Sequence, residues 1–160
     1  MRRQYPIGPQ VMHPTGGRGF RTVGHSGRGV RMAMHRSRLA AIGIDCPTRQ
    51  ADANARFWSG ALRPDAPAPT PMKADDPYVT VGSVSGREVF VQGIRSDEAR
   101  VHLDIETDDV DAEVSRLEAL GATRVEQIRT WWVMRDPSGQ LFCVVRPQTQ
   151  DFPGDAATWP

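Results

Sequence analysis

The chain has 160 residues, 39% of them hydrophobic, and its formal net charge at pH 7 is +1. It has no run of around twenty consecutive apolar residues, so we expect no membrane-spanning helix. The N-terminus lacks the compact apolar segment of a secretory signal, and two cysteines, Cys46 and Cys143, are too few for a disulfide framework. Both observations favour a cytoplasmic protein in a reducing compartment.

The charges are distributed unevenly along the chain. Residues 1–37 contain seven arginines and no acidic residue, which leaves 13 basic and 19 acidic residues in the rest of the chain. This segment is rich in glycine and poor in large apolar residues, so we expect a disordered basic extension. Arginine–glycine segments can bind nucleic acid through phosphate contacts. The acidic remainder gives such binding no support, and an extension without function, preceding a start at Met32 or Met34, is the favoured interpretation.

The first half of the predicted domain, residues 38–96, is expected to hold a strand, a helix and two further strands. Residues 39–46 form an apolar strand, and residues 51–62 have the apolar spacing of a short helix. Two strands surround a turn at Ser85 and Gly86. Five prolines between Arg63 and Pro77 leave room for only a weak edge strand.

The second half, residues 97–147, has a more regular pattern of strand, helix and three strands. Apolar and polar side chains alternate from Val101 onwards, so His102, Asp104 and Glu106 share one face of the first strand. The following helix is expected to begin near Val110 and to end at Gly121, since glycine readily adopts the left-handed conformation of a helix stop. The three remaining strands are predicted over residues 123–130, 131–135 and 140–145.

The two halves repeat one order of elements, although the repeat is architectural and not literal. Pairing Ile42-Gly43-Ile44 with Leu103-Asp104-Ile105 places Ala41 opposite His102. The equivalent positions on the first strand of each half therefore carry different chemistry.

Several of these segments resemble a known domain. His102-Leu103-Asp104, the helix end at residues 116–122 and the motif at residues 136–143 resemble the second half of a glyoxalase-like domain, and Phe57-Trp58 after residues 44–47 resembles the first half. This is the vicinal oxygen chelate superfamily, which includes glyoxalases, extradiol dioxygenases and proteins of bleomycin or fosfomycin resistance.

The resemblance covers residues 38–147 and leaves residues 148–160 as a C-terminal tail. It implies an α+β fold in which two βαβββ modules form a curved, half-open barrel around a cleft. It also implies a homodimer, because many relatives pair their sheets.

Relatives that bind a metal place one ligand on the first strand and one on the last strand of each module. Carried over to this sequence, these positions are Ala41, Gln92, His102 and Cys143. Alanine has no ligand atom, and Cys143 stands where glutamate is usual in the family. The set suits neither a hard divalent ion nor zinc, so no metal is expected. If a metal is bound, its ligands would be Gln92, His102 and Cys143.

Other interpretations of these side chains stay open. His102 could be a pocket histidine bonded to Asp104 or a neighbour, a metal ligand, or an acid–base catalyst. Cys143 is more typical of a small buried residue than of a nucleophile. Of the adjacent Trp131 and Trp132, one should face the helices and the other the cleft, where its ring could stack on a flat ligand.

The expected cleft would thus be lined by Phe90, Gln92, His102, Cys143 and one of the two tryptophans. The favoured function is metal-free binding of a small, partly apolar molecule, as the resemblance to bleomycin-resistance proteins implies. The alternative is a metal-dependent lyase, isomerase or dioxygenase that uses His102 as ligand or base. A partner-binding scaffold is a third option, and glyoxalase I activity is not expected because it would require a complete metal set.

Overall fold

The computed structural model describes residues 34–160, apart from residues 64, 66 and 74–75. The basic extension expected over residues 1–37 therefore lies mostly outside the described residues. Its last four residues, 34–37, are described, and the last three of them belong to the first strand, which begins at His35. None of the helices in the described part of the chain is long and apolar enough to cross a membrane.

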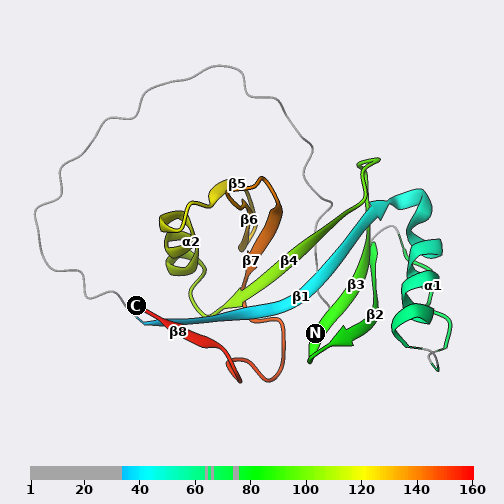
Figure 1. Cartoon of the computed structure of the whole chain (residues 1–160), viewed down its shortest axis with the longest axis horizontal. Helices are drawn as coiled ribbons and strands as arrows, with labels where there is room; N and C mark the ends of the chain where they lie inside the picture. The colour runs from blue at the N-terminus through cyan, green and yellow to red at the C-terminus, as the bar shows by residue number, and fades with distance from the viewer. Residues whose placement is uncertain (1–33, 64, 66, 74–75) are drawn as a thin grey trace, which may run out of the picture.

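The described residues form one curved, unclosed sheet of eight strands with two α-helices, as Figure 1 shows. Its elements are β1 (His35–Pro47), the 3-10 turn η1 (Thr48–Gln50), α1 (Ala51–Leu62), β2 (Tyr78–Val84), β3 (Arg87–Ile94), β4 (Arg100–Thr107), α2 (Val110–Ala119), β5 (Thr123–Ile128), β6 (Trp131–Arg135), β7 (Leu141–Val145) and β8 (Ala157–Trp159). The predicted α+β class is confirmed, and both helices start where the sequence indicated.

The sheet consists of two similar modules joined along β1 and β4. Within each module the first strand runs parallel to the last, β1 to β3 and β4 to β7, whereas β1 and β4 are antiparallel to each other. The strand order is β2-β3-β1-β4-β7-β6-β5, with β8 added beside β1. In the proline-rich connection of the first module, the expected edge strand is reduced to a bridge between Lys73 and Asp76.

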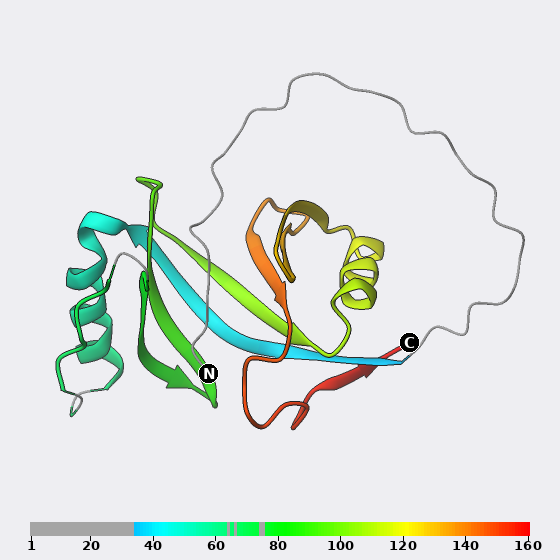
Figure 2. The ribbon, with the colours of Figure 1, turned by 180° about the vertical axis from the view of Figure 1, so that it is seen from behind.

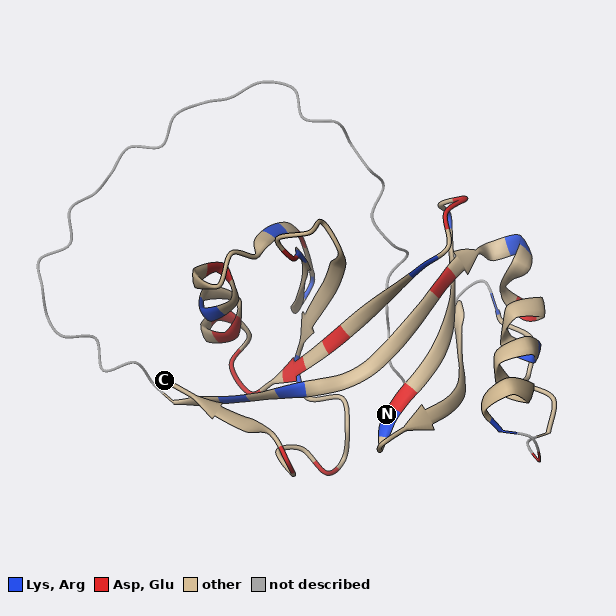
Figure 3. Ribbon diagram, in the orientation of Figure 1, with Lys and Arg blue, Asp and Glu red and all other residues tan. Residues whose placement is uncertain are grey.

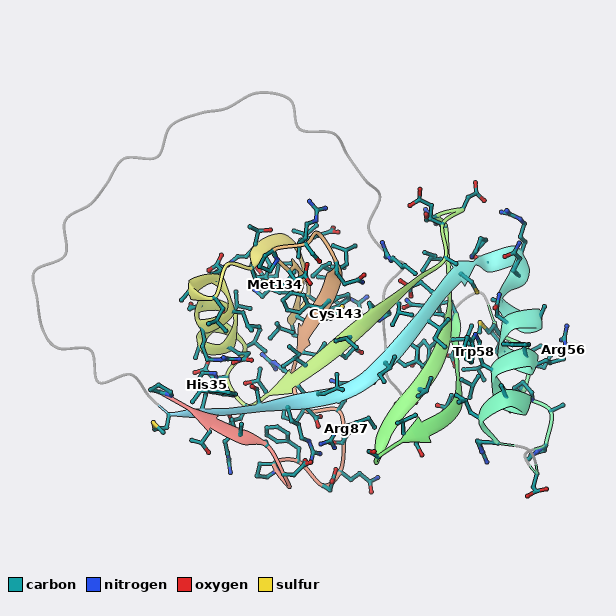
Figure 4. All side chains as sticks on the ribbon, viewed as in Figure 1. His35, Arg56, Trp58, Arg87, Met134 and Cys143 are labelled. Carbon is teal, nitrogen blue, oxygen red and sulfur yellow. The ribbon has the colours of Figure 1, made fainter. Side chains whose placement is uncertain are left out.

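Both helices cover the same face of the sheet, near its two ends (Figure 2). Ile42 contributes to the apolar cluster under α1, and Ile105 contributes to the cluster under α2. Ile42 pairs with Leu103, which points to the same side as Ile105 because alternate residues of a strand share a face. Figure 4 shows Trp58 of α1 on the side of that helix that faces β2, and Met134 of β6 beside α2.

The opposite face carries no helix in the part of the chain that the structure describes, and we call it the inner face. It includes Gly43, Asp45, Phe90, His102, Asp104 and Cys143. Acidic and basic positions lie along β1 and β4 in the middle of the sheet (Figure 3). The polar side of β4 is thus the buried side of that strand, since His102, Asp104 and Glu106 are buried while Val101 and Leu103 are 49% and 40% exposed.

Residues 148–159, which we call the C-terminal strap, return to the start of β1. β8 pairs with residues 35–37, and Arg38 donates hydrogen bonds to the strap residues Asp151 and Asp155. Arg38 also pairs with buried Glu106 at 2.8 Å, and the same glutamate accepts hydrogen bonds from the backbone amides of Gln148 and Thr149. The expected tail is therefore tied to the sheet by buried polar contacts.

Candidate functional site

His102 lies at the centre of the inner face, directly over a glycine of the neighbouring strand. Gly43 is its cross-strand partner, and a Cβ atom built on Gly43 would stand 2.2 Å from Cε1 of the imidazole ring. Ala41, the position in the first module that is equivalent to His102, pairs with Asp104 across the join. β1 and β4 run antiparallel, so equivalent positions of the two modules are not neighbours across the join.

Two buried carboxylates flank the imidazole ring. Nδ1 of His102 lies 3.1 Å from Oδ1 of Asp45, and Nε2 lies 3.6 Å from Oδ1 of Asp104. The first contact is an ion pair by distance, although the ring nitrogen is not aligned with the oxygen as a hydrogen bond requires. The ring of Phe90 packs edge-on against the imidazole with 5.6 Å between centroids. His102 is therefore held on three sides by side chains of β1, β3 and β4.

The carboxylates determine the charge of the histidine. Burial alone would lower the pKa of His102, but Asp45, and to a smaller extent Asp104, outweigh burial and raise this pKa above its ordinary value. Burial acts on Asp45 in the opposite sense, yet His102 and Arg100 hold the pKa of Asp45 below its ordinary value. The imidazolium and the Asp45 carboxylate thus stabilise each other.

Arg100 completes this polar group at the edge of the inner face. Its Nε donates a hydrogen bond of 2.8 Å to Oδ2 of Asp45, while Oδ1 of the same carboxylate faces His102. Asp45 therefore bridges the two cations. Sequence reasoning did not single out Asp45 or Arg100. The available signal was Asp45 itself, a single carboxylate in the otherwise apolar run of residues 39–46, on the same face as Ala41 and Gly43.

Cys143 lies beside Asp104 on the adjacent strand β7. Its thiol is 8% exposed, and burial together with the neighbouring Asp104 carboxylate raises the pKa of Cys143 well above its ordinary value. The thiol is consequently protonated and a poor nucleophile at neutral pH. Three possible metal-ligand atoms, one each from His102, Asp104 and Cys143, lie within 4.8 Å of one another.

This donor set fits a divalent ion poorly. A metal would have to replace the proton on the Cys143 thiol and draw an imidazole nitrogen away from its carboxylate, against the pKa directions of both groups. The symmetry of the two modules also argues against the metal ligands expected from the sequence, which were Gln92, His102 and Cys143. Phe90 pairs with Gly43 as Cys143 pairs with Asp104, so Phe90 is the counterpart of Cys143, and Gln92 lies one step further along β3, paired with Asp45.

The two adjacent tryptophans point to opposite faces, as expected from strand geometry. Trp132 packs into the apolar cluster under α2, and the guanidinium of Arg124 lies 4.9 Å from its ring centroid. Trp131 therefore belongs to the inner face, on the same side of β6 as Val133, which pairs with Cys143. Of the two candidate stacking rings, Trp131 is the one on the His102 side of the sheet.

Comparison with known proteins agrees with this architecture. The family described as "Glyoxalase-like domain" matches residues 41–145. The chain belongs to this family. The vicinal oxygen chelate fold expected for it is the fold observed, with two modules in one curved sheet.

Among solved structures, the chain is similar to an extradiol ring-cleaving dioxygenase from B. fuscum, with 13% identity and a TM-score of 0.43. The similarity covers 70% of this chain and 33% of the dioxygenase, so this glyoxalase-like protein spans about a third of the length of that enzyme. A search of curated protein sequences returned no match.

Proposed function

We propose that this glyoxalase-like protein binds a small, partly apolar molecule on its inner face without a metal ion. The proposal rests above all on the position of His102 between Asp45 and Asp104. Each imidazole nitrogen faces a carboxylate oxygen, so neither nitrogen is directed at an open coordination position. His102 then acts as a buried cation that shapes the site.

The other family ligand positions support the same interpretation. Ala41 carries no donor atom, and its partner on β3 is Glu88, whose carboxylate accepts a hydrogen bond from Thr80. Cys143 retains its proton because burial and Asp104 raise its pKa. The inner face thus combines the aromatic ring of Phe90 with a central cluster of polar side chains, and a small-molecule site needs both kinds of surface.

A binding experiment with 2-naphthol, a flat and partly apolar molecule, tests the proposal on the full chain purified without chelator. We expect the affinity for 2-naphthol to be the same before and after treatment with EDTA. Phe90→Leu should weaken binding, whereas Phe57→Leu, which changes a 64% exposed ring on α1, should leave it unchanged. Elemental analysis showing one equivalent of metal that is lost in His102→Ala, together with metal-dependent binding, would contradict the proposal.

The proximity of His102, Asp104 and Cys143 supports a second candidate, a metal-dependent lyase, isomerase or dioxygenase. In that case Cys143→Ser and Asp104→Asn would both reduce the metal content of the purified protein. The binding function predicts that these variants purify with the same low metal content as the wild type.

A further inference from the structure

Four residues on the inner face form a single row across the first module and the start of the second. Gln92 pairs with Tyr78 on one side and with Asp45 on the other, and Asp45 pairs in turn with Arg100. Neighbouring strands lie about 4.8 Å apart, so Gln92 and Arg100 are separated by about 10 Å across Asp45. The row is adjacent to His102 and Phe90, which form the next row along the sheet.

Arg100 has hydrogen-bond donors that no described residue uses. Within the described part of the chain, only its Nε has a partner, the Asp45 carboxylate. The side chain of Arg100 is 31% exposed, whereas that of Asp45 is 2% exposed. The two terminal nitrogens of the guanidinium therefore present a positive charge and a fork of donors at the accessible end of the row.

Gln92 provides a second polar group that is not satisfied internally. It is 8% exposed, and its side-chain amide has no hydrogen-bond partner among the described residues. Its amide atoms are not among the fully buried atoms that lack a partner, so they can form hydrogen bonds with water or a ligand. The amide lies on the inner face because Gln92 is two positions from Phe90 on β3, and alternate residues of a strand share a face.

The Asp45 carboxylate, which lies between Gln92 and Arg100, already has two cationic partners. Oδ1 of Asp45 faces His102, and Oδ2 accepts from Arg100, so this carboxylate has little capacity left to attract a cationic ligand. His102 and Arg100 together balance Asp45 and Asp104. An added cation would meet the exposed guanidinium, whereas an anion would meet unused donors.

From this row we infer that the molecule bound on the inner face is a small organic oxyanion, such as a carboxylate, held by Arg100 and Gln92. This inference rests on the proposed binding function. The oxyanion accepts hydrogen bonds from the terminal nitrogens of Arg100 and from the side-chain amide of Gln92. The apolar part extends toward Tyr78, whose ring packs edge-on to Phe90 at 6.2 Å.

Three probes that share one apolar body test the inference on the full chain. They are 2-naphthoate, 2-naphthamide and 2-naphthylmethylammonium, whose substituents are anionic, neutral and cationic, and calorimetric titration measures their affinities. We expect 2-naphthoate to bind most tightly. Arg100→Gln should weaken its binding about 10- to 100-fold, as expected for the loss of a charge-assisted hydrogen bond.

Two further variants separate recognition from folding. Arg100→Lys keeps the positive charge beside Asp45 and should retain the preference for the anion, with reduced affinity because lysine lacks the planar fork. Gln92→Leu should weaken the binding of 2-naphthoate by a smaller factor than Arg100→Gln, because the amide of Gln92 carries no charge. The matched control is Arg124→Gln, which removes an arginine paired with Glu118 on the helix side of the sheet and should change nothing.

The outcomes distinguish this inference from the function on which it rests. If the three probes bind equally, or if folded Arg100→Gln binds 2-naphthoate like the wild type, the inference is overturned, and metal-free binding of 2-naphthol would still support the function. If 2-naphthoate binds only when a stoichiometric metal is present, the proposed function fails as well. A preference for the anion that depends on Arg100 in metal-free protein supports both.

Discussion

Gly43 and His102 form one cross-strand pair, and the imidazole ring occupies the space that a side chain at position 43 would need. The position of the ring therefore depends on the absence of a Cβ atom on β1. This relationship, more than any ligand motif, explains how a bulky charged ring is accommodated in the middle of a buried sheet face.

Gly43→Ala tests this relationship directly. The new methyl group would overlap the imidazole, and we expect the free energy of unfolding to fall by about 1 to 3 kcal/mol, as for other overpacked cores. Chemical denaturation measures the loss. Gly60→Ala is the control, because Gly60 lies in α1 with open space around its Cα, and alanine should stabilise that helix by up to about 1 kcal/mol. Equal stability of Gly43→Ala and the wild type would show that the ring does not lie over the glycine.

The ion pair between His102 and Asp45 predicts a pH dependence of stability. The pKa of His102 is raised in the folded protein, so its contribution is complete below its ordinary value of 6.5 and is lost as pH rises through the folded pKa. The pKa of Asp45 is lowered, so its contribution is complete above its ordinary value of 3.8 and is lost as pH falls through the folded pKa. Stability from the pair is therefore greatest between these two ordinary values.

Urea unfolding measured across this range checks the prediction. His102→Gln should remove the decline of stability above pH 6.5 that is specific to the wild type. A wild type that gains stability relative to His102→Gln as pH rises through this region would contradict the assignment of a raised pKa.

Asp45→Asn should destabilise the protein strongly because it leaves His102 and Arg100 without their shared carboxylate. Removing one partner of a buried ion pair typically costs about 3 to 5 kcal/mol. We also expect the pKa of His102, followed by the NMR shifts of its ring protons, to fall. Asp97→Asn is the matched control, since Asp97 is 80% exposed and pairs with Arg49 at the surface, and it should have little effect. An unchanged pKa of His102 in Asp45→Asn would rule out Asp45 as the dominant partner.

The attachment of the C-terminal strap depends on Arg38. Its guanidinium is 4% exposed and joins Glu106 to Asp151 and Asp155, so Arg38→Met should release residues 148–159 from the sheet. We expect faster hydrogen exchange in β8 and at the amides of Gln148 and Thr149. Arg36→Gln serves as the control, because Arg36 stands opposite Thr158 of the strap but its exposed side chain pairs with Asp108. Unchanged exchange in the strap of Arg38→Met would show that β8 pairing alone holds it.

The regular elements could be predicted from the sequence because their causes are local. Alternation from Val101 onwards defined β4, and the carboxylate of Asp109 accepts a hydrogen bond from the amide of Ala112 at the predicted start of α2. Trp131–Arg135 has the predicted boundaries. Each of these features depends on residues within a few positions of one another.

The composition of the site could not be predicted in the same way. Asp45 and Arg100 are 55 positions apart, and their contact depends on the register between β1 and β4. A bulge between Leu39 and Ala41 changes which face the early residues of β1 occupy, so Arg38 reaches Glu106 on the inner side. Short strap residues such as Thr149 acquire their role only when the chain returns to this strand.

The pairing of β8 with β1 joins the two ends of the folded unit. Trp159 stands opposite His35 in an antiparallel pair, which is the arrangement that a hairpin requires. A circularly permuted chain, linked from Trp159 to His35 and opened at the exposed turn between Val84 and Arg87, would keep every strand pair of the described residues. The order of elements along the polypeptide is thus separable from their arrangement in space, and the inner face would be assembled from a sequence that starts in the middle of the first module.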